Sequence, residues 1–271
     1  MNTPILPLVV EPKELADQLQ NPNLALIHIT KPEVYSKHHL PGARFVAGSR
    51  FVRIEKPIMG LLPDLTTLST LLSSLGINND THIVAYDDEG GGWAGRLLWT
   101  LDVIGHRHFS LLNGGLVAWF NEGFPVDQAQ VEPVPDQYNI AGTTSAQSSC
   151  EYIMSRLGAA DFALLDSRTP DEFNGVKKLA SRGGHIPGAA NLNWLDTMDK
   201  SRNIRFLPDA ELRAQLASRG LTPDKEIVCY CQSHHRSSHA YIMLKKLGYE
   251  RISGYPGAWS EWGNRPDTPL G

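Results

Sequence analysis

Cysteine is scarce in this chain, with only Cys150, Cys229 and Cys231 among 271 residues. An odd number of cysteines argues against a disulfide framework. The N-terminus also lacks the charged start and long apolar stretch of a secretory leader, since it turns polar at residues 11–14. We therefore expect a reducing, cytoplasmic setting, in which most free thiols are inert core residues.

Long apolar runs and charge of one dominant sign are missing as well. No run approaches the roughly 18 apolar residues of a membrane span. Charged residues make up 20% of the chain and the formal net charge is -4, so no basic surface for nucleic acid is expected. These absences predict a globular protein that binds neither membrane nor nucleic acid. The hydrophobic content of 41% is enough for a substantial core.

The chain does contain an internal repeat. In order along the two copies, residues 24–35 match 162–173, residues 39–43 match 185–189, and residues 83–87 match 227–231. The offset stays near 143 from there to the end, which chance would not produce over about a hundred positions. The second copy carries eight extra residues within 174–184, including Lys177, Lys178 and Arg182. Two interpretations of this insertion stay open. It is either a solvated loop, or a border of the active-site cleft whose basic residues raise the electrostatic potential of the cleft.

The repeat predicts two domains, at residues 1–126 and 148–271. Residues 127–147 between them are polar and show neither helical nor strand period, as expected for a linker. In each copy, short apolar runs alternate with helical patterns. Buried strands are expected at 24–29, 83–86, 163–166 and 227–230. The predicted fold class is therefore α/β, with a parallel sheet flanked by helices in each half.

Cys231 is the strongest candidate for chemistry, because it lies where a predicted strand ends and a helix begins. The carboxyl ends of parallel strands are where ligands bind in such folds. Unpaired N–H groups at the start of the following helix lower the pKa of a thiol placed there. His234, His235 and Arg236 add donors or positive charge on the same turn, and Ser237 or Ser238 is expected to cap the helix.

The loop and three further motifs resemble the tandem-domain rhodanese family, and specifically thiosulfate sulfurtransferases. The loop reads Cys-Gln-Ser-His-His-Arg at 231–236, close to the Cys-Gln-Thr-His-His-Arg form of bacterial members. The other motifs are Asp-Ser-Arg at 166–168, Gly-His-Ile-Pro-Gly-Ala at 184–189, and Gly-Ala-Trp-Ser-Glu-Trp at 257–262. The resemblance covers nearly the whole chain, including the doubled architecture.

The resemblance implies sulfur transfer through Cys231. The thiolate attacks the sulfane sulfur of thiosulfate, sulfite leaves, and a persulfide passes its sulfur to a thiophilic acceptor such as cyanide or a thiol. The expected substrate-binding residues are Gln232, Ser233, His234, His235 and Arg236, with the guanidinium fork of Arg236 as a clamp for the sulfonate. Asp166 and Arg168 are expected to support the active-site strand as an ion pair, with direct catalysis the second choice. No cofactor or metal is implied, and we expect a monomer.

The first copy has Asp87 at the position of Cys231, so it cannot form a persulfide, and its acidic loop predicts a catalytically silent domain. Gly90, Gly92 and Gly95 of this loop also spell G-x-G-x-x-G, a dinucleotide-binding pattern. The repeat already explains the loop, and no acidic residue ends the next strand. The nucleotide hypothesis is therefore weak.

Other hypotheses remain for the loop itself. Phosphatases with a reactive cysteine place their arginine six residues after it, whereas Arg236 is five after Cys231, which makes a tighter cradle. A zinc site using Cys231, His234, His235 and His239 lacks a second spaced pair of ligands. Cys229 aligns with Ala85 inside a strand and is expected to be a buried core residue. The alternatives within the family are a 3-mercaptopyruvate sulfurtransferase, or a persulfide carrier that delivers sulfur to an acceptor protein.

Overall fold

The computed structural model describes residues 4–271, and its described residues divide into two compact units. Unit 1 comprises residues 4–51, 63–144 and 199–205. Unit 2 comprises residues 52–62, 145–198 and 206–271. Two segments thus cross the division that the repeat suggests: 52–62 lies in the first copy but belongs to unit 2, and 199–205 lies in the second copy but belongs to unit 1.

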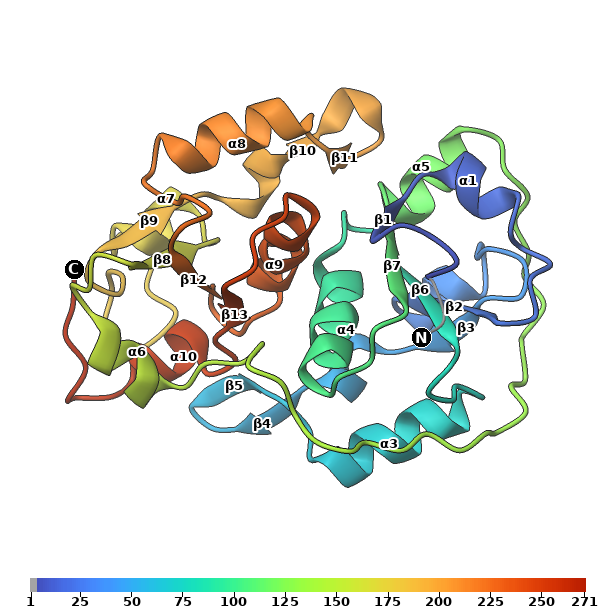
Figure 1. Ribbon diagram of the computed structural model, residues 1–271, viewed down its shortest axis with the longest axis horizontal. Helices are drawn as coiled ribbons and strands as arrows, with labels where there is room; N and C mark the ends of the chain where they lie inside the picture. The colour runs from blue at the N-terminus through green and yellow to red at the C-terminus, as the bar shows by residue number, and fades with distance from the viewer. Residues whose placement is uncertain (1–3) are drawn as a thin grey trace. The chain divides into compact units, whose positions relative to one another are not determined.

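Unit 1 is built on a five-stranded sheet of order β1-β7-β6-β2-β3, in which every pairing is parallel (Figure 1). Its strands are β1 (Val9–Val10), β2 (Leu24–Ile29), β3 (Arg44–Val46), β6 (His82–Tyr86) and β7 (Phe109–Leu112). Its helices are α1 (Pro12–Ala16), α2 (Pro32–Tyr35), the 3-10 helix η1 (Gly48–Phe51), α3 (Leu65–Ser74), α4 (Gly92–Val103) and α5 (Gly115–Asn121). The core of this unit includes the fully buried Tyr86 and Trp119.

Unit 2 has a four-stranded parallel sheet of order β13-β12-β8-β9. Its strands are β8 (Phe162–Asp166), β9 (Ala189–Asn191), β12 (Glu226–Tyr230) and β13 (Ile252–Gly254), and an antiparallel hairpin is formed by β4 (Arg53–Glu55) and β5 (Ile58–Leu61). Its helices are α6 (Cys150–Arg156), α7 (Pro170–Phe173), η2 (Trp194–Thr197), α8 (Asp209–Ala217), α9 (Arg236–Lys246) and α10 (Ala258–Trp262). Between η2 and α8 the chain also forms β10 (Met198–Asp199), η3 (Lys200–Arg202) and β11 (Arg205–Phe206), of which residues 199–205 belong to unit 1.

The predicted α/β class with a parallel sheet in each half is confirmed, and the repeat is visible in the topology. β2 and β6 pair in parallel in unit 1 just as β8 and β12 do in unit 2. The four predicted strands are present, three of them beginning one residue earlier than predicted. Their residues are almost all buried, which explains why they read as continuous apolar runs rather than alternating ones.

Two helices of unit 2 are defined by local signals in the sequence. α7 opens with a capping box, in which Thr169 and Glu172 satisfy each other's backbone N–H groups, and with Pro170 in its first turn. α9 ends with Lys245 and Lys246 in its last turn, where positive charge interacts favourably with the helix dipole. Gly248 follows with φ 80°, a left-handed conformation that is common after a helix end.

The predicted cap of α9 is wrong. The helix begins at Arg236 with His235 in the N-cap position, so Ser237 and Ser238 lie inside the first turn. Their hydroxyls serve the preceding loop instead, because Ser238 Oγ donates to the carbonyl of His234 at 2.6 Å. The serines therefore shape the loop rather than the start of the helix.

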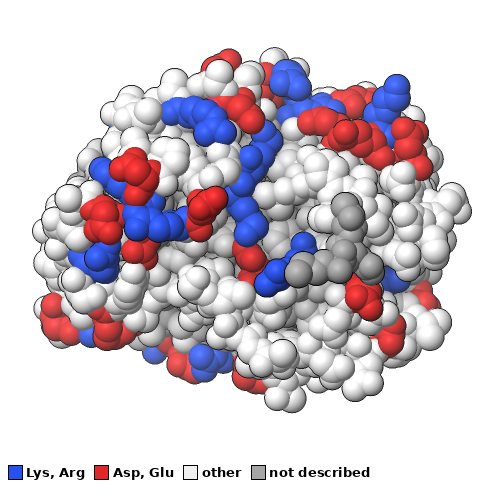
Figure 2. All heavy atoms as spheres, viewed as in Figure 1, with Lys and Arg blue, Asp and Glu red and all other residues white. Residues whose placement is uncertain are grey.

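Within residues 4–271, no helix combines the length and the apolar character needed to cross a membrane. Acidic and basic side chains both occur across the face shown in Figure 2, and neither sign covers it.

Candidate active site

Cys231 directly follows β12, a strand that pairs with β8 on one side and β13 on the other. The loop 231–235 is short because α9 begins at Arg236. α9 packs against β12 and β13, which fixes the start of the helix relative to the strand end. The cysteine thus lies where a central strand, a tight loop and a helix N-terminus meet.

The carbonyl groups of the loop are bound from behind by α10. The N–H of Trp259 donates to the Cys231 carbonyl at 3.0 Å, and the N–H of Ser260 donates to the Gln232 carbonyl at 2.9 Å. His234 adopts φ 54°, a left-handed conformation that a non-glycine residue rarely takes. With the carbonyls held outward and the chain turned at His234, the N–H groups of Ser233 and Ser237 approach the sulfur of Cys231.

These contacts set the protonation of the thiol. Cys231 is 1% exposed, and burial by itself raises the pKa of a thiol. The positive charge of Arg236, the hydroxyl and N–H of Ser237 and the N–H of Ser233 outweigh burial and lower the pKa of Cys231 below its ordinary value. The other thiols behave in the opposite way: burial raises the pKa of Cys150 to about 11 and raises that of Cys229 further. Cys231 is thus the thiol that the structure prepares as a thiolate.

Arg236 is held by a residue that the sequence did not single out. Its two terminal nitrogens donate to the two carboxylate oxygens of Glu172 at 2.7 and 2.8 Å. Burial would raise the pKa of Glu172, which is 2% exposed, but the hydrogen bonds and charge of Arg236 and the contacts of Thr169 lower it to about 2. The guanidinium of Arg236, which the sequence led us to expect as a clamp for the sulfonate, is therefore paired with the carboxylate of Glu172 in this structure.

Asp166 and Arg168 form the ion pair expected from the sequence, with side chains 0% and 1% exposed. The guanidinium donates to both oxygens of Asp166 at 2.6–3.0 Å and to the carbonyl of Gly184 at 2.8 Å. It also lies over the ring of Trp259, 4.4 Å from the centroid. The pair thus joins the end of β8 to α10, whose N–H groups hold the loop 231–235.

The remaining loop side chains differ in what they contact. His234 is fully buried, and its Nδ1 lies 2.8 Å from the Ser237 hydroxyl. Gln232 donates to the carbonyl of Leu179 at 3.0 Å, which joins the insertion in 174–184 to the loop 231–235. His235 is partly exposed, with its ring 5.9 Å from that of Trp194.

A further support comes from the β4–β5 hairpin, which sequence reasoning assigned to the first copy. A Cβ on Gly60 would lie 2.3 Å from the Ser233 carbonyl oxygen and 2.5 Å from that of Pro256. The N–H of Met59 also donates to Ser260 Oγ at 3.0 Å. The hairpin therefore lies directly against the loop 231–235, and only glycine fits at position 60.

The corresponding loop of unit 1 shows the same cradle filled by the protein itself. Oδ1 of Asp87 accepts the N–H groups of Glu89, Gly90 and Gly91 at 2.8–3.1 Å, and Oδ2 accepts that of Ala94 at 3.0 Å. The carboxylate of Asp87 thus accepts the hydrogen bonds that an external anion bound in this loop would need.

The contacts also align the two loops. The N–H of Ala94 reaches Asp87 as the N–H of Ser237 reaches Cys231, so Trp93 stands at the position of Arg236. The unit 1 loop is one residue longer and has no cation at this position.

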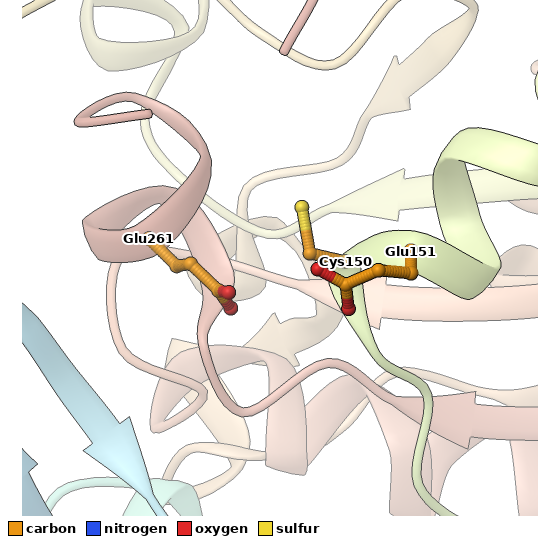
Figure 3. Close-up of side chains that lie close together, drawn as sticks. All are labelled: Cys150, Glu151 and Glu261. Carbon is orange, nitrogen blue, oxygen red and sulfur yellow. The ribbon is translucent and has the colours of Figure 1, made fainter. Parts of the chain in front are cut away.

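Among the described residues, one group could be read as a metal site: Cys150 and Glu151 from α6 with Glu261 from α10 (Figure 3). Their ligand atoms lie within 4.8 Å of one another. Arg265 already pairs with Glu151 at 2.5 Å, and the hydroxyl of Tyr255 donates to Glu261 at 2.8 Å. The raised pKa of Cys150 also keeps its thiol protonated at neutral pH. This set of donors does not fit a metal ion. His239, one of the four residues of the zinc hypothesis that the sequence already disfavoured, places its Nε2 2.9 Å from the Thr197 hydroxyl.

Glu172 and the hairpin are the parts of the site that sequence reasoning missed. For Glu172 a signal existed, because it lies two residues after the Asp-Ser-Arg-Thr-Pro segment and the repeat places Val34 at its position in the first copy. For the hairpin no local signal existed, since its role depends on contacts with residues about 170–200 positions away.

Comparison with known proteins shows which family the chain belongs to. A family model described as a rhodanese-like domain matches twice, at residues 11–122 and 149–265. The thiosulfate sulfurtransferases of Pseudomonas aeruginosa and Azotobacter vinelandii are each 46% identical over 265 residues, covering 98% of this chain and 97% of each relative. The sulfur carrier protein TtuD of Thermus thermophilus is 31% identical, covering 94% of this chain and 93% of TtuD.

Solved structures show the same fold at lower identity. YnjE, and an EanB variant in complex with ergothioneine, each superpose with a TM-score of 0.87 at 21% identity. The match covers 97% of this chain and 68–69% of those chains. At that identity the likeness supports the fold alone. The two family matches and the full-length relatives show that the chain belongs to the rhodanese family, with the family's domain present twice.

Proposed function

We propose that the protein is a thiosulfate sulfurtransferase that carries sulfur on Cys231 as a persulfide. The observation that carries the proposal is the buried Cys231 thiol, whose pKa is lowered by Arg236, Ser233 and Ser237 at the end of β12. The 46% identity to two thiosulfate sulfurtransferases over nearly the whole chain supports the same substrate.

The reaction follows from these groups in two half-reactions. The Cys231 thiolate attacks the outer sulfur of thiosulfate, a new S–S bond forms, and sulfite leaves with the electron pair of the broken bond. The N–H groups of Ser233 and Ser237 then face an anionic persulfide, and Arg236 balances its charge. Cyanide or a thiolate next attacks the outer sulfur and takes it, and the Cys231 thiolate is restored.

In this mechanism the side chains in and around the loop 231–235 have separate tasks. Glu172 positions Arg236 as a fixed charge, and His234 orients the Ser237 hydroxyl toward the sulfur. Asp166 and Arg168 position the loop through Trp259. His235 is the side chain we assign to the substrate, because its ring is partly exposed at the loop. Unit 1 is catalytically silent because the carboxylate of Asp87 already occupies the N–H donors of its loop.

We further infer that one chain is sufficient for catalysis, since every group assigned to the reaction belongs to unit 2. A reducing compartment such as the cytoplasm suits three free thiols, one of them reactive. A 3-mercaptopyruvate sulfurtransferase of Pseudomonas aeruginosa is a more distant relative, at 31% identity, so thiosulfate is the favoured donor.

The test is the intact mass of the protein before and after thiosulfate treatment. We expect a gain of one sulfur atom, removal of that sulfur by cyanide, and loss of both events in Cys231→Ala but not in Cys229→Ala. Steady-state turnover with thiosulfate and cyanide should give ping-pong kinetics and exceed turnover with 3-mercaptopyruvate. A sulfur gain that persists in Cys231→Ala would overturn the proposal.

A further inference from the structure

The insertion of the catalytic half has an anchored base and an exposed tip, which we define as residues 176–179. In the base, Arg182 donates to the carbonyls of Thr268 and Trp262 at 2.8 and 2.7 Å, and its N–H donates to that of Gly263 at 3.0 Å. The neck is closed by glycines, since a Cβ on Gly175 would lie 2.9 Å from the nitrogen of Gly184. The tip is therefore held on a fixed support.

The side chains of the tip are apolar and basic. Val176 is 76% exposed and Leu179 is 46% exposed. Lys177 and Lys178 between them are also exposed, and within residues 4–271 the structure gives neither ammonium a carboxylate partner. The whole stretch 174–184 contains three basic residues and no acidic one. Apolar side chains beside uncompensated positive charge are suited to an acidic partner that also offers an apolar contact.

The tip is joined by a hydrogen bond to the loop that contains Cys231. The carbonyl of Leu179 accepts a hydrogen bond from Gln232, the residue next to Cys231. On the hairpin, Met59 is 39% exposed and precedes Gly60, which lies against the Ser233 carbonyl. Two segments that contact the same catalytic loop thus both present apolar side chains to solvent.

The burial of Cys231 restricts what can take its sulfur. Because Cys231 is only 1% exposed, a thiol on the flat surface of a folded protein could not reach the persulfide. A free small molecule or an extended chain segment is slim enough. Only the chain segment would also reach residues 176–179.

From these observations we propose that the insertion tip docks an extended, acidic segment of an acceptor protein and guides its thiol to Cys231. The acidic side chains pair with Lys177 and Lys178, and an apolar neighbour contacts Val176 and Leu179. The acceptor thiolate attacks the outer persulfide sulfur, the bond between that sulfur and Cys231 breaks, and Cys231 leaves as a thiolate with the electron pair. The proposal rests on the persulfide function proposed above.

The experiment uses the full-length protein loaded with sulfur by thiosulfate and freed of excess reagent. Two short cysteine peptides serve as acceptors: one contains leucine and glutamates beside the cysteine, and the other has glutamine in place of each glutamate. Peptide persulfide is followed by mass spectrometry. We expect the acidic peptide to react about tenfold faster than the glutamine peptide at low salt. At about 0.5 M NaCl, where exposed charges are screened, the two rates should become equal.

Matched variants separate docking from chemistry. The double variant Lys177→Gln/Lys178→Gln should reduce the preference for the acidic peptide to within about twofold, while discharge to the neutral thiol dithiothreitol stays unchanged. The double variant Lys31→Gln/Lys37→Gln changes the net charge equally on exposed positions of unit 1 and should keep the preference.

The outcomes are distinct. Equal rates for the two peptides, or a preference that survives Lys177→Gln/Lys178→Gln, would overturn the docking proposal. So would binding of the tip to vesicles of anionic phospholipid without discrimination between the peptides. Failure of the protein to gain sulfur from thiosulfate would instead overturn the proposed function, and the mass measured before any peptide is added shows this directly.

Discussion

Replacement of Glu172 by glutamine tests how the charge at Cys231 is held in place. The carboxylate is 2% exposed and bonds both terminal nitrogens of Arg236. Its pKa falls from an ordinary value of 4.5 to about 2, which corresponds to about 3 kcal/mol at about 1.4 kcal/mol for each tenfold change in the protonation equilibrium. Glutamine keeps one oxygen as an acceptor, so we expect Glu172→Gln to lower the free energy of unfolding of unit 2 by about 2–3 kcal/mol.

The pH dependence gives this prediction its sign. Because the pKa of Glu172 is lower in the folded state, its contribution is fully present above about pH 4.5 and is lost as the pH falls toward 2. Urea unfolding of both proteins should therefore show the largest difference at neutral pH and a shrinking difference below pH 4.5. The control Glu211→Gln removes the same charge from an exposed position of α8 and should change stability by less than about 0.5 kcal/mol.

The variant should also affect the thiol. Without the carboxylate, Arg236 is no longer fixed beside Cys231, so the pKa of the thiol should rise toward its ordinary value and kcat/KM for thiosulfate should fall at neutral pH. The rate of alkylation by iodoacetamide against pH reports the thiolate. A destabilisation that is constant from pH 7 to pH 3, or an alkylation profile that moves to lower pH, would refute the role assigned to Glu172.

Three further predictions follow from other contacts of unit 2. Iodoacetamide should alkylate Cys231 with a midpoint below the ordinary thiol value, whereas Cys150, whose pKa is about 11, should stay unmodified at neutral pH; equal reactivity would contradict the assignment of the thiolate. Asp166→Asn leaves the buried guanidinium of Arg168 without its countercharge and should lower the free energy of unfolding by about 3–5 kcal/mol, measured by urea unfolding. A decrease below about 1 kcal/mol would contradict the supporting role of this ion pair. Gly60→Ala should displace the catalytic loop and reduce kcat/KM about 10- to 100-fold, whereas Gly142→Ala, which meets nothing within 4 Å, should leave it unchanged.

Much of the architecture could be predicted from the sequence because it depends on local pattern. The apolar runs ending at Tyr86 and Tyr230 gave the central strands, and the doubled pattern gave two parallel sheets. Cys231 could be placed at a strand end because its neighbours in sequence are also its neighbours in space. The cap of α9 was predicted wrongly because Ser237 and Ser238 have the right type for a cap, while their hydroxyls bond within the loop instead.

The supports of the site could not be predicted in the same way. Glu172 lies 64 residues before Arg236, and the pairing depends on how α7 and the catalytic loop are placed by the sheet of unit 2. The hairpin lies still further away in sequence, and its assignment to unit 2 comes only from contacts such as that of Gly60 with Ser233. A residue pattern carries no information about partners that the chain brings together only on folding.

The sequence alone determined the α/β fold, the repeat and the candidate nucleophile, because strand periodicity, helix signals and the loop from Cys231 to Arg236 are local. Tertiary structure decided the state of that nucleophile. The lowered pKa of Cys231 results from the balance between its burial and the charge and donors around it, and the position of Arg236 in that balance depends on Glu172. The energy of a charge depends on distance and on surrounding solvent, and both are set only when the chain has folded.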